Sequence, residues 1–152
     1  MSGGLELRAM QPADLPFVRL QPAQQALARE MTPATAEAMR SAGIAFSVLE
    51  HGRPIAAAGL ILSMGPPAIA WAVLSPAAGR HLVRLSAWCR LVLAASEVVE
   101  TGVDPSFAAG RRWARLLGFT ATGQPVERWD SPGSELWRRC GVRGPHSPAR
   151  KD

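Results

Sequence analysis

The sequence predicts an α+β fold, with a mixed, mostly antiparallel sheet, one parallel β-α-β crossover and helices on both faces. Three apolar runs are separated by short turns, which is typical of an antiparallel meander; they cover residues 44–50, 53–63 and 68–74. A helical stretch over 79–95 then precedes another strand over 97–103. Because a helical crossover joins parallel strands, this strand should lie parallel to 68–74. The apolar character of the second and third runs also predicts cover on both faces.

The flanking segments complete the predicted order. Residues 5–10 alternate apolar and polar side chains, as a short strand does. Helix formers dominate 22–42, and Thr32 with Pro33 supplies a cap and a first-turn proline, so we expect two helices there. A further helix should begin at Asp104-Pro105 and end at a left-handed Gly118. Short strands are expected around 126–129 and over 135–139.

Length and composition limit the classes of protein that fit. A chain of 152 residues with 47% apolar and 19% charged residues suits one globular domain, which we assign to 1–142, with a polar tail at 143–152. No apolar run approaches the about 18 residues of a membrane span, so no membrane partner is expected. The first residues include Glu6 and no apolar signal core, which favours a cytoplasmic location with free thiols at Cys89 and Cys140.

Charge and ligand spacing exclude further classes. The net charge of +5 lies in the second half of the chain and favours anionic partners. No nucleic-acid-binding motif accompanies it, so nucleic acid ranks last among the partners considered. Three scattered histidines and two distant cysteines offer no metal-ligand spacing, and no metal site is predicted. A ligand cleft is instead expected where strand 68–74 diverges from strand 97–103.

The element order and two segments resemble a known family. The segment VDPSFAAGRRWARLLGF (103–119) and the opening LELRAMQPADLPFV (5–18) look like parts of the GNAT N-acetyltransferases, and the resemblance covers residues 5–140. It implies transfer of an acyl group from acetyl-CoA to an amine on a small molecule or a protein. Short, degenerate members from tailed bacteriophages look most similar. The alternative is therefore a catalytically inactive structural or assembly protein of a phage or prophage particle, with virion partners and a virion location.

The resemblance also assigns residues to the coenzyme. The family's phosphate loop corresponds to 74–83, where Ala78, Gly79 and Arg80 precede a helix N-terminus that favours anions. This loop has one glycine where the family usually has two small residues. An asparagine that often contacts the coenzyme falls on Phe107, and Arg111 is the candidate for the ribose phosphate. The general-acid tyrosine of many members is replaced by Ala114, and the chain contains no tyrosine.

The remaining chemical candidates lie near the expected cleft. Backbone N–H groups of Val73 and Leu74 are the candidates that polarise the thioester carbonyl, and Glu100 and His81 are the candidate general bases. For both bases the alternative is an ordinary surface role.

Two further surface features are predicted. Arg111, Arg112 and Arg115 should share one exposed helix face, either solvated or facing an acidic partner. Trp129 and Trp137 are predicted to be exposed or at an interface.

Overall fold

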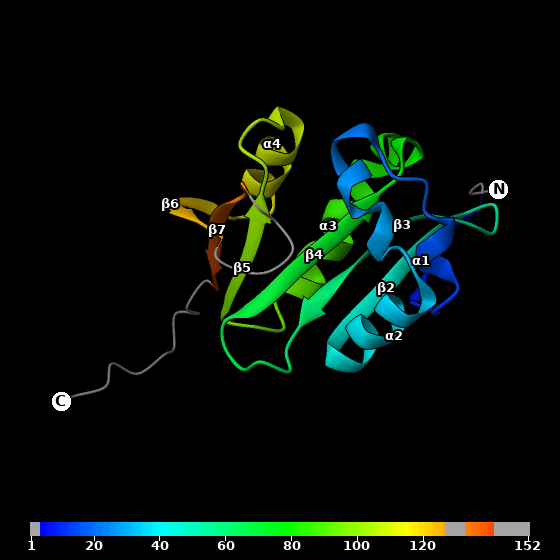
Figure 1. Ribbon diagram of the computed structural model, residues 1–152, viewed down its shortest axis with the longest axis horizontal. Helices are drawn as coiled ribbons and strands as arrows, with labels where there is room; N and C mark the ends of the chain where they lie inside the picture. The colour runs from blue at the N-terminus through cyan, green and yellow to red at the C-terminus, as the bar shows by residue number, and fades with distance from the viewer. Residues whose placement is uncertain (1–3, 127–132, 142–152) are drawn as a thin grey trace.

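One mixed sheet organises the chain. The computed structural model describes residues 4–126 and 133–141. Within these residues seven strands form a sheet in the order β1-β2-β3-β4-β5-β7-β6, in which only β4 and β5 are parallel (Figure 1). The strands are β1 Leu5–Ala9, β2 Gly43–Glu50, β3 Arg53–Ile61, β4 Ala68–Leu74, β5 Val98–Val103, β6 Thr120–Pro125 and β7 Glu135–Cys140. The predicted meander and the parallel crossover are both confirmed.

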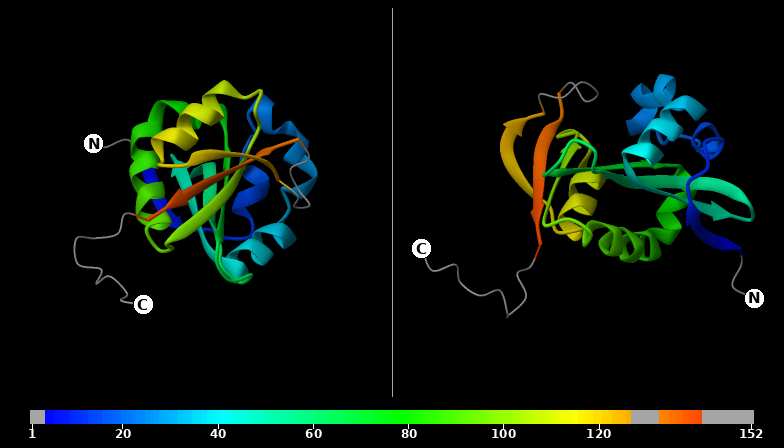
Figure 2. Two further views of the ribbon diagram at one scale, coloured as in Figure 1. Left: turned by 90° about the vertical axis from the view of Figure 1, so that its left-hand side faces the viewer. Right: turned by 90° about the horizontal axis from the view of Figure 1, so that it is seen from below.

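Helices cover both faces of this sheet. They are α1 Asp14–Phe17, α2 Pro33–Ala42, α3 Leu82–Leu93 and α4 Ala108–Leu116, with 3-10 segments η1 Pro22–Glu30 and η2 Pro76–His81. Figure 2 shows α1, η1 and α2 on one side of the sheet and α3 and α4 on the other. Among the described residues, no helix combines the length and apolar character needed to cross a membrane.

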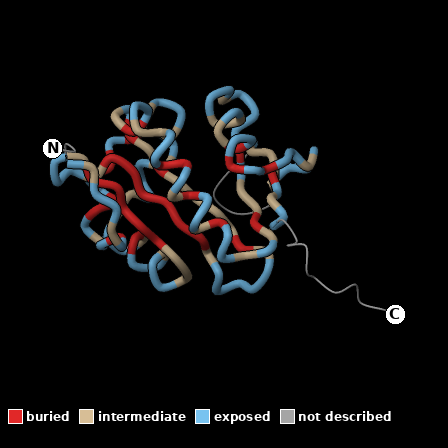
Figure 3. Tube along the Cα trace, turned by 180° about the vertical axis from the view of Figure 1, so that it is seen from behind, coloured by how far each residue is buried: buried red, intermediate tan, exposed pale blue. Residues whose placement is uncertain are grey.

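Each face has its own core. Leu85, Cys89 and Leu117 belong to the cluster on the α3–α4 face, whereas Leu15 and Ala36 belong to the cluster on the α1–α2 face. Buried positions follow the central strands, and the outer surfaces of the helices are exposed (Figure 3). Burial raises the pKa of the Cys89 thiol to about 11, so this side chain packs in the core as a neutral thiol.

Several local predictions are confirmed in detail. The Thr32 hydroxyl accepts a hydrogen bond from the Thr35 N–H at 3.1 Å and caps α2. Gly118 has a φ of 94° and ends the α4 region in the left-handed conformation, as expected of a C-terminal glycine.

Other boundaries differ from the sequence predictions. The segment before α2 is a 3-10 helix rather than an α-helix, because it fully buries no side chain that would stabilise regular α-turns. Helix α4 starts at Ala108, since Asp104 instead accepts the Ser106 N–H at 2.9 Å in a turn that precedes the helix. Strand β6 directly follows Gly118-Phe119, where no strand was predicted, and the strand predicted around 126–129 lies outside the described residues beyond residue 126.

The prediction for Trp137 is wrong, and that for Trp129 lies outside the described residues. Trp137 is only 2% exposed. Strand β7 lies between β5 and β6 rather than at the sheet edge, so Trp137 has strands on both sides. The Arg115 guanidinium also covers its ring at 5.4 Å from the centroid. The C-terminal strands therefore bury an aromatic residue that the short remaining sequence suggested would be exposed. The predicted tail at 143–152 likewise lies outside the described residues.

Candidate functional site

Strands β4 and β5 are paired only where they begin. Their parallel register joins Ala68 to Val99 and Ile69 to Glu100. The Thr101 hydroxyl then donates to the Ala70 carbonyl at 3.0 Å. Beyond this point β5 pairs with β7 and β4 pairs with β3, so the two strands diverge toward their carboxyl ends (Figure 1). The opening expected from the sequence is present in the structure.

A large hollow lies on the α1–α2 face at this opening. Its volume is about 830 Å³, and its walls come from η1, α2, β4, β5 and β6. Strand β4 forms part of its floor, which explains why the middle of β4 is half-buried rather than covered on both faces as predicted. Trp71 and Val73 point to this face, where they pack with the α1–α2 core.

A second, small hollow lies on the α3–α4 face. Its volume is about 60 Å³, and apolar side chains including Cys89, Trp113 and Phe119 line it. Both hollows are lined by Ala70, Trp71 and Ala72. The short segment of β4 just beyond the last β4–β5 pair therefore borders a hollow on each face of the sheet.

The free edge of β4 is occupied by the chain itself. The Gln24 Nε2 donates to the Ala72 carbonyl at 2.9 Å, and the Leu74 N–H donates to the Gln24 Oε1 at 2.9 Å. The Gln21 N–H donates to the Leu74 carbonyl at 3.1 Å. Because backbone groups alternate in direction along a strand, Leu74 faces this edge whereas Val73 faces β3. Of the two predicted carbonyl contacts, only Leu74 has its N–H on the side of the opening.

The loop after β4 holds the predicted phosphate-binding residues. Ala78 is fully buried, and a Cβ added at Gly79 would meet open space. Ser75, the first residue of the loop, is 6% exposed, and its hydroxyl has no hydrogen-bond partner among the described residues. The loop thus combines an open approach at Gly79 with a buried, unpartnered hydroxyl at Ser75.

Arg80 and His81 both contact one carboxylate. Arg80 forms an ion pair with Glu50 at 2.5 Å, and the His81 Nε2 lies 2.8 Å from the other Glu50 oxygen. Hydrogen bonds from Arg80 and then His81 lower the pKa of Glu50 to about 2. In this arrangement the charge of Arg80 is directed to the end of β2 rather than toward the loop.

The two candidate bases lie in different environments. Glu100 lines the large hollow, its side chain is 14% exposed, and it accepts a hydrogen bond from Arg138 at 3.1 Å. His81 is not among the residues described around either hollow. The structure therefore brings Glu100, but not His81, to the point where β4 and β5 separate.

Phe107 and Arg111 lie at the start of α4. The Phe107 ring packs beside Gly110, where a Cβ would come within 2.5 Å of the Phe107 Cδ1. Arg111 is half-buried, whereas Arg112 and Arg115 are exposed, so the predicted arginine face is confirmed for two of its three members. Trp113 donates its Nε1–H to the Ser86 hydroxyl at 2.9 Å, which ties α4 to α3.

Two residues of the opening were not identified from the sequence. Gln24 lies in a run of helix formers that carries no sign of a contact with β4. Trp71 lies inside the apolar run 68–74, where the sequence does not distinguish it from a core residue, but it borders both hollows, and its buried Nε1 has no partner among the described residues. Among the residues that the structure describes, no three His, Cys, Asp or Glu side chains lie close enough together to hold a metal ion.

Comparison with known proteins identifies the fold. No family model matches the chain, and no curated protein matches its sequence. Solved structures of GNAT acetyltransferases do match over nearly the whole chain. The chain therefore has the GNAT fold, which confirms the predicted fold class.

Three of these structures illustrate the likeness. Ard1 from Thermoplasma volcanium is 17% identical, with a TM-score of 0.67, and the match covers 92% of this chain and 99% of that one. The ribosomal-protein-S18-alanine N-acetyltransferase from Escherichia coli is 16% identical, with a TM-score of 0.62 and coverages of 93% and 97%. The PaiA N-acetyltransferase from Thermoplasma acidophilum, solved with coenzyme A, is 10% identical, with a TM-score of 0.64 and coverages of 91% and 99%.

Proposed function

We propose that this protein transfers an acetyl group from acetyl-CoA to a primary amine. One observation carries the proposal: hollows on opposite faces of the sheet meet at Ala70–Ala72, where β4 and β5 separate. Two reactants approaching from opposite faces would meet at this segment. The GNAT fold of the compared acetyltransferases supports the same activity.

The chain offers suitable groups for the coenzyme. The edge of β4 that β5 does not pair with carries backbone N–H and C=O groups of Ala72 and Leu74. These groups could bind the amides of a pantetheine arm after the Gln24 side chain has moved away. The loop at Ala78, Gly79 and Arg80 is proposed to face the diphosphate, which would approach the open backbone at Gly79 after the Arg80 side chain has left Glu50. We assign Phe107 and Arg111, at the start of α4, to the remainder of the coenzyme.

The chemistry requires a proton acceptor for the amine. Acetyl-CoA, when bound, supplies a thioester whose carbon–sulfur bond is exchanged for an amide bond, with release of the thiol. Glu100 lines the large hollow on the α1–α2 face, where β4 and β5 separate, and we propose that the amine enters this hollow. The Glu100 carboxylate would then take the proton from the amine. Its hydrogen bond from Arg138 orients the carboxylate. His81 is the second candidate, and its contact with Glu50 makes it the less accessible one.

Calorimetric titration of the whole chain with acetyl-CoA tests this proposal, followed by an assay of thiol release with and without an added amine. We expect saturable one-to-one binding and thiol release that depends on the amine. No heat at millimolar acetyl-CoA would overturn the proposal. It would favour the alternative of a noncatalytic phage-particle protein, for which the comparisons give no support.

A further inference from the structure

The outer surface of α3 is apolar although it faces solvent. Val83 and Leu91 are the two most exposed large apolar side chains among the described residues, at 85% and 74%. Ala87 lies between them at a spacing of four residues, and Ala94 follows at the end of the helix, so these four exposed residues form one stripe. A contiguous apolar surface of this kind on a folded protein typically marks an interaction site.

Two arginines border the apolar stripe. With about 3.6 residues per helical turn, Arg90 lies on one side of the stripe and Arg84 on the other. The Arg90 Nη2 donates to the Leu116 carbonyl of α4 at 3.0 Å, and the Arg84 guanidinium lies 5.9 Å from the centroid of the Trp88 ring. Neither arginine forms an ion pair within the described part of the chain. The stripe and its two positioned cations are called the α3 face below.

The surroundings of the α3 face are also positive. Hydrogen bonds from Arg90 to Leu116 and from Trp113 to Ser86 place α4 beside α3. Both helices are described throughout, and neither contains an acidic residue. The exposed arginines of α4 add to the positive potential of this side of the molecule, which attracts an acidic partner.

Charge and side-chain size limit what can cover the α3 face. A second copy of this chain is opposed, because a two-fold axis would bring the arginines of one face against those of the other. Ala87 and Ala94 carry only a methyl group, so a helix of another protein can approach closely and place larger side chains over them. A lipid surface has no such side chains to place there.

We infer that the α3 face binds an acidic amphipathic helix of another protein. Apolar side chains of that helix cover the two alanines and pack against Val83 and Leu91, and its carboxylates pair with Arg84 and Arg90. The α3 face lies outside the coenzyme loop and outside both hollows, so the inference does not depend on the proposed function.

A peptide probe tests this inference on the unaltered protein. The probe is a fluorescein-labelled peptide of three Leu-Ala-Ala-Leu-Glu-Gln-Glu repeats, which span about six helical turns with leucines on one side and glutamates beside them. We expect saturable binding by fluorescence anisotropy, weakened as salt rises from about 0.05 to 0.5 M. Replacement of every Glu by Gln, or of every Leu by Ser, should weaken binding by roughly five- to tenfold or more. No binding at about 1 mM of the probe, or equal binding of the three peptides, would overturn the inference.

Substitution of the apolar stripe has a matched control on the other side of the sheet. Leu91→Ser should weaken binding of the probe by roughly tenfold, because it removes a side chain that the probe buries. Phe17→Ser should leave binding unchanged, since Phe17 is 72% exposed but lies on α1. Equal losses for the two variants would contradict binding at the α3 face.

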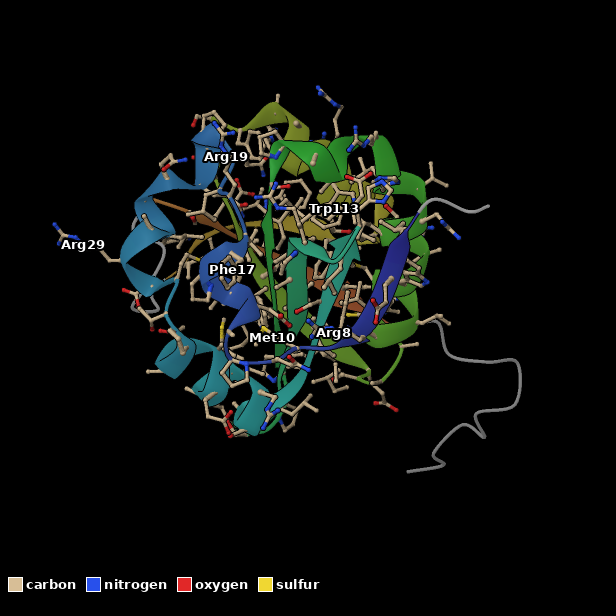
Figure 4. All side chains as sticks on the ribbon, turned by 90° about the vertical axis from the view of Figure 1, so that its right-hand side faces the viewer. Arg8, Met10, Phe17, Arg19, Arg29 and Trp113 are labelled. Atoms are coloured by element: carbon tan, nitrogen blue, oxygen red, sulfur yellow. The ribbon has the colours of Figure 1, made fainter. Side chains whose placement is uncertain are left out.

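A reversal of charge tests the two arginines. Arg84→Glu combined with Arg90→Glu should reverse the preference, so that a peptide with Lys in place of every Glu binds more tightly than the probe. Arg19→Glu combined with Arg29→Glu changes the net charge equally on the α1–α2 side, where Arg29 extends away from the molecule (Figure 4). This control should keep the wild-type preference. A reversal in both double variants would show that net charge alone governs binding, and would reject the inference.

Two further measurements identify a different occupant. A dimer in sedimentation that Leu91→Glu separates would show that a second copy covers the α3 face. Binding to phosphatidylserine vesicles that Leu91→Ser abolishes, without binding of the probe, would show that a membrane covers it. Either result would overturn the inference.

Discussion

Gln24 reaches from η1 to the free edge of β4, and its replacement by alanine has two opposite effects. Its amide exchanges hydrogen bonds with the Ala72 carbonyl and the Leu74 N–H, each at 2.9 Å. A net hydrogen bond contributes about 1 kcal/mol, so Gln24→Ala should lower the free energy of unfolding by about 2 kcal/mol.

The same change should strengthen coenzyme binding. In the wild-type protein the Gln24 amide must leave before a pantetheine amide can pair with Leu74. Without this competitor, the binding free energy of acetyl-CoA should become more favourable by at most about 2 kcal/mol. This corresponds to a dissociation constant that is lower by about thirtyfold. Stability and affinity therefore change in opposite directions.

Urea unfolding and calorimetric titration with acetyl-CoA measure the two effects. Gln25→Ala is the matched control, since the Gln25 amide donates to the Leu20 carbonyl at 2.9 Å and does not contact β4. The control should leave acetyl-CoA affinity unchanged. A Gln24→Ala protein that is less stable but binds acetyl-CoA equally or more weakly would refute competition at the β4 edge.

Three further predictions concern the loop and the charged contacts. Gly79→Leu should leave the melting temperature unchanged, because a Cβ at this position meets open space. The same variant should weaken acetyl-CoA binding in calorimetry. Unchanged affinity would show that the loop does not face the coenzyme. Asp14 is 4% exposed and accepts hydrogen bonds from two side chains and one backbone N–H. Asp14→Ala should therefore lower the free energy of unfolding in urea by about 3 kcal/mol, whereas the control Glu37→Ala, at an exposed ion pair, should lower it by less than about 0.5 kcal/mol. Similar losses for the two variants would contradict the importance of the Asp14 network. The folded-state pKa of Glu50 is about 2 against an ordinary value of 4.5, so its stabilisation is complete above pH 4.5 and is lost as pH falls toward 2. The stability difference between wild type and Glu50→Gln in urea should therefore shrink over that range, and a constant difference would contradict the ion-pair account.

Much of the fold was predictable because it depends on local patterns. The meander follows from successive apolar runs and short turns, and the parallel crossover follows from one helix between two strands. Glu100 was placed near the opening because it lies in the strand that was predicted to pair with 68–74, and the observed register then brings it to the last β4–β5 pair. The cap at Thr32 and the left-handed Gly118 likewise depend on single residue types and their neighbours.

The details of the site depend on contacts between distant segments. Gln24 lies 48 and 50 residues before its partners on β4, and Glu50 lies 30 residues before Arg80. Helical periodicity carries no information about either pair. The burial of Trp137 also depends on the insertion of β7 between β5 and β6, which strand propensity does not determine.

A titration followed by backbone amide NMR tests the central claim most directly, because it locates the coenzyme on the chain. With acetyl-CoA added to the labelled protein, the largest shifts should occur at the amides of Ala72 and Leu74 and at the side-chain amide of Gln24. Shifts confined to the exposed Arg112 and Arg115 face, with the β4 amides unchanged, would contradict the account.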